Sequence, residues 1–289
     1  MKLDDRLLQD IAELQSNNEI SAAVKLSAII KPQDAESESH LFSTRGVPHY
    51  YYGKREKATV VVNLNPGKAA KIADKEFENA PEEYKRQPTD LFIENYHKEQ
   101  RTYVLKVENA DSFDVKQAAF LTPWRDNGID LPQNPDWNDK ETRNIAAKRV
   151  IDNKLQLELV PYASAKFDFS SRCVELLFPY VDTILDEIFA KERKYIIFAS
   201  SKFEHIFKHY NKVNPNTFDL SKPIQQSDAP LKEGGSLYGQ CRVIFINHNG
   251  ETRPALIAHT FPSQALGRAY KLMQKYGEFC FDEYIKTIL

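Results

Sequence analysis

Two polar residues that follow apolar runs are the best candidates for chemistry in this chain. Asn65 comes soon after Thr59-Val60-Val61-Val62, within the segment Asn63-Leu64-Asn65-Pro66-Gly67, and His259 directly follows Pro254-Ala255-Leu256-Ile257-Ala258. A neutral imidazole and an amide together can position a water molecule and stabilise a developing oxyanion. These residue types therefore indicate hydrolysis of a bond with an acidic leaving group.

The runs before these two residues predict buried strands. Apolar and β-branched residues without polar alternation are typical of strands covered on both faces, as in a parallel sheet under helices. Ligands of open α/β sheets bind beyond the carboxyl ends of the strands. We therefore expect Asn65 and His259 to face one crevice, although Asn, Pro and Gly are also the usual residues of an ordinary turn.

The rest of the chain predicts the elements that would position these residues. Apolar spacing predicts two N-terminal helices that end before Pro32. Further strands are expected at 155–160, 195–199 and 241–246, and helices at 81–96, 139–151, 170–190, 200–210 and 263–276. Asn249-Gly250 predicts a hairpin turn. Residues 118–124 are expected to form an apolar segment used mainly for packing, and residues 214–235 are expected to form a surface loop. This alternation predicts a three-layer α/β/α sandwich with a mainly parallel central sheet.

The predicted organisation has two parts. Residues 1–57 form an N-terminal helical cap with an aromatic lead-in, and residues 58–289 form an α/β domain with a long insertion at about 68–153. The lead-in places the aromatic rings of Tyr50, Tyr51 and Tyr52 immediately before the first buried strand. Such rings can pack at a domain seam or stack on a base.

Composition excludes several classes of protein. The 289 residues are 42% hydrophobic and 28% charged, with a formal net charge of −2, so no global basic field attracts nucleic acid. Any nucleic-acid contact must use a local patch. Cys173, Cys241 and Cys280 have no metal-site or disulfide spacing. No apolar run approaches the roughly 18 residues of a membrane span, and we expect a cytoplasmic protein with no metal and no cofactor.

With these motifs in place, the chain resembles the uracil-DNA glycosylase superfamily over roughly residues 58 to 276. In that family the first strand ends in a Gly-x-Asn-Pro-Gly or Gly-Gln-Asp-Pro type of motif, and the last strand ends in a His-Pro-Ser-Pro type. The counterparts here are Asn63-Leu64-Asn65-Pro66-Gly67 and His259-Thr260-Phe261-Pro262-Ser263. With Asn in its first motif, the chain is similar to the mismatch-specific and single-strand-selective branches of the family.

The resemblance implies that a damaged or mismatched base flips out of DNA and that its N-glycosidic bond is cleaved. Asn65 would orient the attacking water, and His259 would hydrogen-bond the base oxygen that gains charge. Asn63, Glu158 and Tyr52 would contact the base. The phosphate and DNA contacts implied by the resemblance are Ser263, Leu266 as the wedge that fills the vacated stack, Arg268 and Ser200.

Three departures from the family pattern affect the expected substrate, the width of the pocket or catalysis. Glu158 stands where many members have an Asn that reads the pyrimidine edge, and a carboxylate only accepts hydrogen bonds, so it would repel the O4 of uracil. Glu158 can instead accept from an exocyclic amino group, or serve a structural role. Thr260-Phe261 lengthens the last motif, and Asn63 replaces a Gly that lets the backbone approach the base.

Two other functions stay open at this point. The first is a catalytically silent protein that keeps the crevice and binds abasic or damaged DNA without turnover. The second is a hydrolase of a free nucleoside or another small molecule, which the acidic pI of about 6.4 and the long insertion favour.

Overall fold

The computed structural model describes residues 1–27, 41–68, 70–92, 94, 112–169, 171–230, 238–260 and 269–289. The chain divides into two compact units. Unit 1 comprises Met1–Tyr52, Asn63–Gln100 and Leu157–Ala190, and unit 2 comprises Gly53–Val62, Arg101–Gln156 and Lys191–Leu289. Each unit is therefore assembled from separate stretches of sequence. The predicted division into residues 1–57 and 58–289 stays a prediction.

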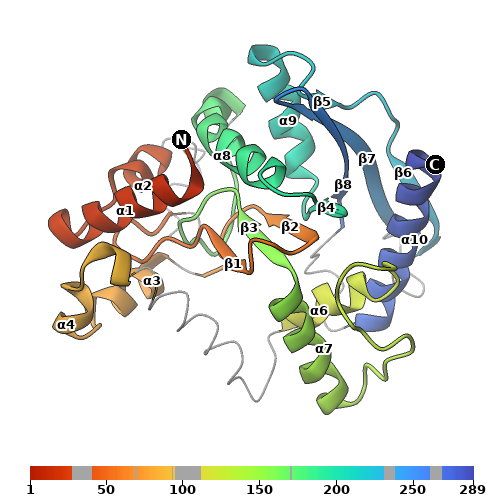
Figure 1. Ribbon diagram of the computed structural model, residues 1–289, viewed down its shortest axis with the longest axis horizontal. Coiled ribbons are helices and arrows are strands. Elements are labelled where there is room, and N and C mark those ends of the chain that lie inside the picture. Colours follow the sequence, from red (N-terminus) through yellow and green to blue (C-terminus); the bar gives the residue numbers. More distant parts are fainter. Residues whose placement is uncertain are drawn as a thin grey trace. The chain divides into compact units, whose positions relative to one another are not determined.

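Helices and strands alternate along much of the chain (Figure 1). The described helices are α1 (Leu3–Asn17), α2 (Ser21–Leu26), α3 (Ala70–Glu78), α4 (Glu82–Lys85), α6 (Ser112–Leu121), α7 (Lys140–Asn153), the 3-10 helix η3 (Ser171–Leu177), α8 (Phe178–Phe189), α9 (Lys202–Val213) and α10 (Tyr270–Ile288). The strands are β1 (Tyr51–Gly53), β2 (Thr59–Asn63), β3 (Leu155–Glu158), β4 (Tyr195–Phe198), β5 (Phe218–Asp219), β6 (Gln225–Pro230), β7 (Tyr238–His248) and β8 (Glu251–Ala258).

The strands form one sheet in the order β1-β3-β2-β4-β8-β7-β5, with β6 paired to β7. Its centre is parallel, because β2 pairs with β4 from Thr59↔Tyr195 onward and β4 pairs with β8 in the same direction. The pairs of β7 with β8, β5 and β6 are antiparallel. The structure is therefore an α/β fold with a mixed central sheet flanked by helices. The parallel arrangement predicted from the sequence applies to the centre of that sheet.

Within unit 2 the two faces of β4 contact different helices. Tyr195 and Ile197 belong to the hydrophobic cluster that α6 and α10 share, whereas Phe198 packs against Phe203 and Phe207 of α9, with ring centroids 5.0 and 4.9 Å away. This alternation follows from the two-residue period of a strand. Unit 2 thus has helix, sheet and helix layers.

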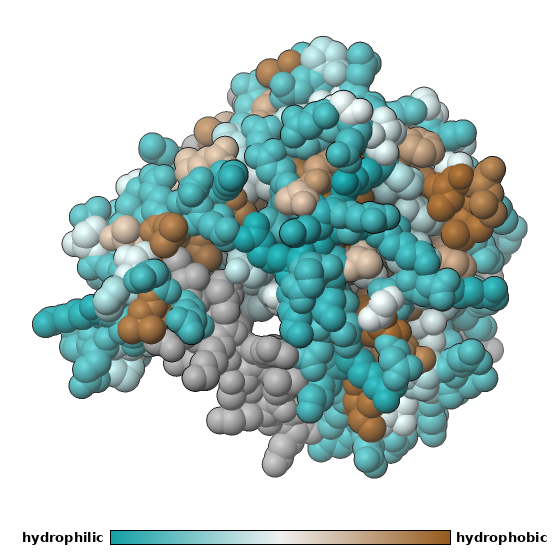
Figure 2. Space-filling view, viewed as in Figure 1, coloured by the Kyte–Doolittle hydropathy of each residue, from teal (hydrophilic) through white to brown (hydrophobic). Residues whose placement is uncertain are grey.

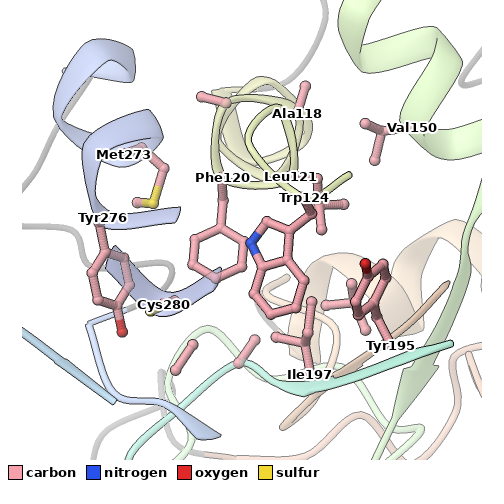
Figure 3. Packing of buried hydrophobic residues seen from close by; sticks show 14 of the residues in the cluster. Ala118, Phe120, Leu121, Trp124, Val150, Tyr195, Ile197, Met273, Tyr276 and Cys280 are labelled. Atoms are coloured by element: carbon pink, nitrogen blue, oxygen red, sulfur yellow. The ribbon is translucent and has the colours of Figure 1, made fainter. Parts of the chain in front are cut away.

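The core between α6, α10 and the sheet is rich in aromatic side chains. The indole of Trp124, 2% exposed, points toward Ile197 and lies between Phe120 and Tyr195 (Figure 3). Its ring centroid is 5.8 Å from that of Phe120 and 5.0 Å from that of Tyr195. The packing role expected for residues 118–124 is confirmed.

Two local sequence signals gave the expected structures. Asp139 caps α7, and its carboxylate accepts a hydrogen bond from the Thr142 amide at 2.7 Å. Asn249 and Gly250 join β7 to β8 as a two-residue turn with φ values of 50° and 82°. Both residues tolerate positive φ, which that turn requires.

Two predicted elements were wrong. The single helix expected over 81–96 is interrupted: α4 ends at Lys85 and helix resumes after Pro88, because proline disfavours helical conformation in the residue before it. The surface loop expected over 214–235 contains β5 and β6, which pair with the long strand β7. Pairing with β7 supplies the backbone hydrogen bonds that local sequence alone does not reveal.

The visible face of the molecule is mainly hydrophilic. Figure 2 shows hydrophilic residues over most of the visible face, with hydrophobic residues in separate patches. In the parts of the chain that the structure describes, no helix is long and apolar enough to cross a bilayer.

Candidate strand-end site

The carboxyl end of β2 carries two asparagines in unit 1. Asn63 is the last residue of the fully buried β2, and Asn65 lies half-buried two residues later. The chain at the end of β3 runs alongside, because the Leu159 amide donates to the Asn63 carbonyl at 2.9 Å and the Val160 amide donates to the Leu64 carbonyl at 2.8 Å. Both asparagines therefore stand at a hydrogen-bonded strand end, as the apolar run before them predicts.

The side chain of Asn65 is held in one orientation. Its Nδ2 donates to the carbonyl oxygen of Ser164 at 3.0 Å and to that of Pro66 at 2.9 Å. The Ser164 amide in turn donates to the Pro66 carbonyl at 3.1 Å. Because carbonyl oxygens only accept, these partners assign the nitrogen and the oxygen of the Asn65 amide. Oδ1 of Asn65 is thereby presented as a fixed hydrogen-bond acceptor.

Asn63 and Glu158 form a buried pair. The Nδ2 of Asn63 donates to Oε1 of Glu158 at 3.1 Å, and the two residues are 7% and 3% exposed. Among the described residues, Oδ1 of Asn63 has no hydrogen-bond partner. The pair therefore contains acceptor oxygens, and one of the two N–H groups of the Asn63 amide is directed to the carboxylate.

His49 lies at the same edge of the sheet. The His49 amide donates to the Pro161 carbonyl at 2.7 Å, and the Glu158 amide donates to the Tyr50 carbonyl at 3.0 Å. The two segments therefore run antiparallel, which brings the residues before β1 beside the carboxyl end of β3. The Tyr52 hydroxyl lies 2.7 Å from Nδ1 of His49, and the two rings stack with centroids 5.6 Å apart.

The imidazole of His49 is neutral. Burial, followed by the nearby positive charge of Lys68, lowers the pKa of His49 to about 3. Lys68 follows the Asn65-Pro66-Gly67 turn, its amide donates to the Pro66 carbonyl at 2.9 Å, and its ammonium pairs with Glu76. A neutral imidazole and a fixed amide thus occur together in unit 1.

Sequence reasoning did not identify His49, Lys68 or Ser164 as site residues. His49 stands in the aromatic lead-in, three residues before Tyr52, and Lys68 directly follows the first motif. The sequence signals available for His49 and Lys68 were these positions, beside residues that the sequence analysis had already selected. The ring of Tyr52 contacts His49, and its expected contact with a base stays a prediction.

His259 lies in unit 2, in a cluster of charged groups. Its Nε2 is 3.3 Å from Oε2 of Glu204, whose other oxygen is 3.3 Å from Nη2 of Arg242 and 2.6 Å from Nζ of Lys208. The side chains of His259 and Glu204 are 9% and 11% exposed. The His259 ring is therefore held in an ionic environment at the end of β8.

Burial and charge set the protonation of this cluster. Burial lowers the pKa of His259, and the positive charges of Arg242 and Lys208 add to that effect, while the Glu204 carboxylate opposes it. For Glu204, burial acts to raise the pKa, but the hydrogen bond from Lys208 and the charge of Arg242 outweigh it, so the pKa is lowered. The cluster therefore contains a carboxylate and a neutral imidazole.

Of the remaining predicted site residues, the structure describes Ser200. The Oγ of Ser200 accepts from the Lys202 amide at 3.2 Å, at the start of α9. Ser263, Leu266 and Arg268 lie outside the described residues. Asn65 belongs to unit 1 and His259 to unit 2, so the crevice that they were expected to share stays a prediction.

Comparison with protein-family models, with curated proteins and with solved structures finds no match to this chain. In the described ranges, no group of three or more His, Cys, Asp and Glu side chains is arranged to hold a metal ion. The strand-end site in unit 1 brings together the fixed Asn65 amide, the Asn63–Glu158 pair and the neutral His49.

Proposed function

We propose that this protein is a DNA base-excision enzyme that hydrolyses the N-glycosidic bond of a flipped base, with a fold of the uracil-DNA glycosylase type. The observation that carries the proposal is the Asn65 amide. Its Nδ2 is committed to the carbonyls of Ser164 and Pro66, which leaves Oδ1 as an acceptor in a fixed position. Such an acceptor orients a water molecule by taking a hydrogen bond from it.

In the proposed reaction this water attacks C1′ of the deoxyribose. The new C–O bond forms while the N-glycosidic bond breaks, and the electron pair of that bond leaves with the base. The proton lost by the water passes to the departing base. Asn65 takes no proton itself, because an amide is not a base at neutral pH, so its contribution is orientation.

The departing base gains negative charge, which a neutral imidazole N–H can stabilise. Among the described residues of unit 1, His49 supplies an imidazole, and in the tautomer whose Nδ1 accepts from the Tyr52 hydroxyl the ring proton is on Nε2. His259, the imidazole expected from the second motif, is the alternative donor. Substitution of His49 and of His259 in turn distinguishes which of the two stabilises the departing base.

The Asn63–Glu158 pair favours a base with an exocyclic amino group. Glu158 only accepts hydrogen bonds, and one N–H of the Asn63 amide is directed to it, so oxygens are the main hydrogen-bonding groups of the pair. An amino group donates to such oxygens, whereas the O4 of uracil would be repelled.

The test is strand cleavage after alkaline treatment of labelled oligonucleotides, single-stranded and duplex. The lesions are uracil, hypoxanthine, xanthine and a G·T mismatch, together with the amino-bearing bases 5-methylcytosine and mismatched adenine. We expect cleavage at one of these bases and a loss of about 10²- to 10³-fold in kcat/KM for Asn65→Ala. Asn17→Ala, an exposed amide in the same unit, is the matched control and is expected to keep full activity.

His49→Gln and His259→Gln then identify the group that stabilises the leaving base. The variant that loses kcat with little change in KM marks that group. No cleavage of any substrate at high enzyme concentration would contradict the proposal. If labelled DNA still bound under those conditions, the result would favour the catalytically silent nucleic-acid-binding protein.

A further inference from the structure

Helix α9 (Figure 1) carries two histidines one turn apart, His205 and His209. Residues four positions apart lie on the same side of a helix, so the two imidazoles are neighbours. Both residues are partly exposed, whereas the buried side of the helix includes Phe203 and Phe207. The histidine pair can therefore be reached from solvent.

The rings of His205 and His209 are in direct contact. Their centroids are 4.3 Å apart, and their planes are inclined by 42°. A zinc–nitrogen bond is about 2.0–2.1 Å long, so two imidazoles that bind one ion must lie this close together. Two histidines at the same spacing on one helix face supply zinc ligands in the metalloprotease motif His-Glu-x-x-His. The pair in α9 therefore has the spacing and the contact that a two-nitrogen metal chelate requires.

A backbone hydrogen bond selects the nitrogen of His209 that is available to a metal. Its Nδ1 lies 3.1 Å from the carbonyl oxygen of His205, and a carbonyl only accepts, so Nδ1 carries a proton and donates it. In the neutral ring the lone pair is therefore on Nε2. Histidines that bind metals usually donate their other ring N–H to a carbonyl or carboxylate, which fixes the orientation of the ring. His209 already makes this supporting hydrogen bond.

The surroundings of His205 favour its neutral form, which is the form that binds a metal. Burial lowers the pKa of His205, and the charges of its neighbours on α9, including Lys208 and Lys212, lower it further. These positive charges also oppose a metal cation, but the Lys208 ammonium is paired with the Glu204 carboxylate at 2.6 Å. Removal of the Lys212 charge is therefore expected to strengthen the binding of a cation, whereas it would weaken the binding of an anion.

We propose that His205 and His209 together bind one divalent transition-metal ion of the kind that imidazole favours, such as Zn²⁺ or Ni²⁺, with Nε2 as the ligand atom of His209. Two protein nitrogens leave the other coordination positions of the ion to water. From the sequence we expected no metal, and the His-x-x-x-His spacing within α9 is the signal that this expectation did not use. The metal site goes beyond the proposed base excision and does not depend on it.

The test is isothermal titration calorimetry of the full chain, freed of metal with a chelator, against Zn²⁺ and Ni²⁺ at pH 7.5. We expect His205→Gln and His209→Gln each to weaken binding of both ions by about tenfold or more, since loss of even a supporting partner of a ligand costs about that much. His248→Gln, which removes a partly exposed histidine of β7, is the control and is expected to bind like the wild type.

A second variant tests the spacing itself. His209→Gln/Lys212→His keeps two histidines on α9 but separates them by seven residues, which is about 10 Å along the helix. One ion cannot reach both rings, so we expect this variant to bind as weakly as His209→Gln. Lys212→Gln, at an exposed position, keeps the pair intact and is expected to bind Zn²⁺ about two- to fivefold more tightly than the wild type.

Thermal unfolding with and without Zn²⁺ provides an independent readout. An ion that binds the folded helix raises the unfolding midpoint, so we expect a rise for the wild type and for His248→Gln, and a smaller rise for His205→Gln. Circular dichroism checks that each variant is folded. Absence of saturable binding to the wild type, unchanged affinity in His205→Gln and His209→Gln, or wild-type affinity in the variant with separated histidines would each overturn the inference.

Discussion

Asp10 is buried in unit 1 among tyrosine hydroxyls. Tyr50 and Tyr162 both donate to its Oδ2, at 2.8 and 2.7 Å, and the Tyr162 and Tyr180 hydroxyls are 3.2 Å apart. Burial raises the pKa of Asp10 to about 6 against the opposing effect of both hydrogen bonds. The carboxyl is 4% exposed, so burial of its charged form is costly.

This pKa predicts how stability changes with pH. The folded protein holds the Asp10 proton more tightly than the unfolded chain, so stability falls as pH rises from about 4 to above 6. The difference between 3.8 and about 6 corresponds to about 3 kcal/mol. We expect Asp10→Asn, which can still accept from both tyrosines, to exceed the wild type by about that amount at pH 7 and by almost nothing near pH 4.

Urea unfolding followed by circular dichroism at pH 4 to 7 measures this difference. Taking the variant against the wild type at each pH cancels other titrations, including that of His49, which acts in the opposite direction because acid favours its protonated unfolded form. Asp5→Asn, at an exposed position of α1, serves as the control. A variant no more stable than the wild type at pH 7 would show that the buried carboxylate costs little.

Among the elements, α10 and α6 approach closely because one residue lacks a side chain. Gly277 of α10 is buried, and a Cβ placed there would meet the backbone of Phe120 at its carbonyl group. The two helices share the aromatic cluster of unit 2. The close packing of α6 and α10 therefore requires a small residue at position 277.

Gly277→Ala is expected to lower the free energy of unfolding by about 1–3 kcal/mol. Helix propensity alone would favour Ala by about 1 kcal/mol, so a net loss identifies the steric contact as the stronger effect. Thermal unfolding is the measurement. Gly67→Ala, where nothing lies within 4 Å of the added Cβ, is the control, and its stability should stay close to the wild type. Equal or higher stability of Gly277→Ala would mean that the helices can move apart at little cost.

At the scale of the whole molecule, the cluster around Trp124 joins segments from distant parts of the sequence. It includes side chains of β2, α6, α7, β4, β7, β8 and α10, all within unit 2. Trp124 touches Phe120, Tyr195, Phe281 and Tyr284, with centroids 5.0 to 5.8 Å apart. The sheet of unit 2 and its helices α6, α7 and α10 therefore depend on one shared core.

Trp124→Ala is expected to destabilise the protein by about 3–5 kcal/mol, because the lost contacts leave a cavity. Urea unfolding monitored by far-ultraviolet circular dichroism gives the value. Val213→Ala removes an apolar side chain that is 60% exposed and should change stability by about 0.5 kcal/mol or less. A loss below about 1 kcal/mol for Trp124→Ala would show that the core around it can collapse.

The sequence by itself determined the features that depend on neighbouring residues. The apolar run 59–62 forms β2, Asp139 caps α7, and Asn249-Gly250 makes the hairpin turn, because strand burial, capping and turn geometry involve residues a few positions apart. The α/β class follows from the alternation of these elements. Pro88 also indicates the interruption of the helix expected over 81–96, although the prediction did not take this proline into account.

Only the tertiary structure decided which groups surround the candidate residues. Asn65 is fixed by Ser164, 99 positions away, Asn63 pairs with Glu158, 95 positions away, and Glu204 meets Arg242 across 38 positions. The low pKa of His49 likewise comes from burial and from Lys68. Hydrogen-bond direction, burial and charge act through space, so residue types and spacing indicated where Asn65 would stand, and the folded chain determined which of its atoms can take part in chemistry.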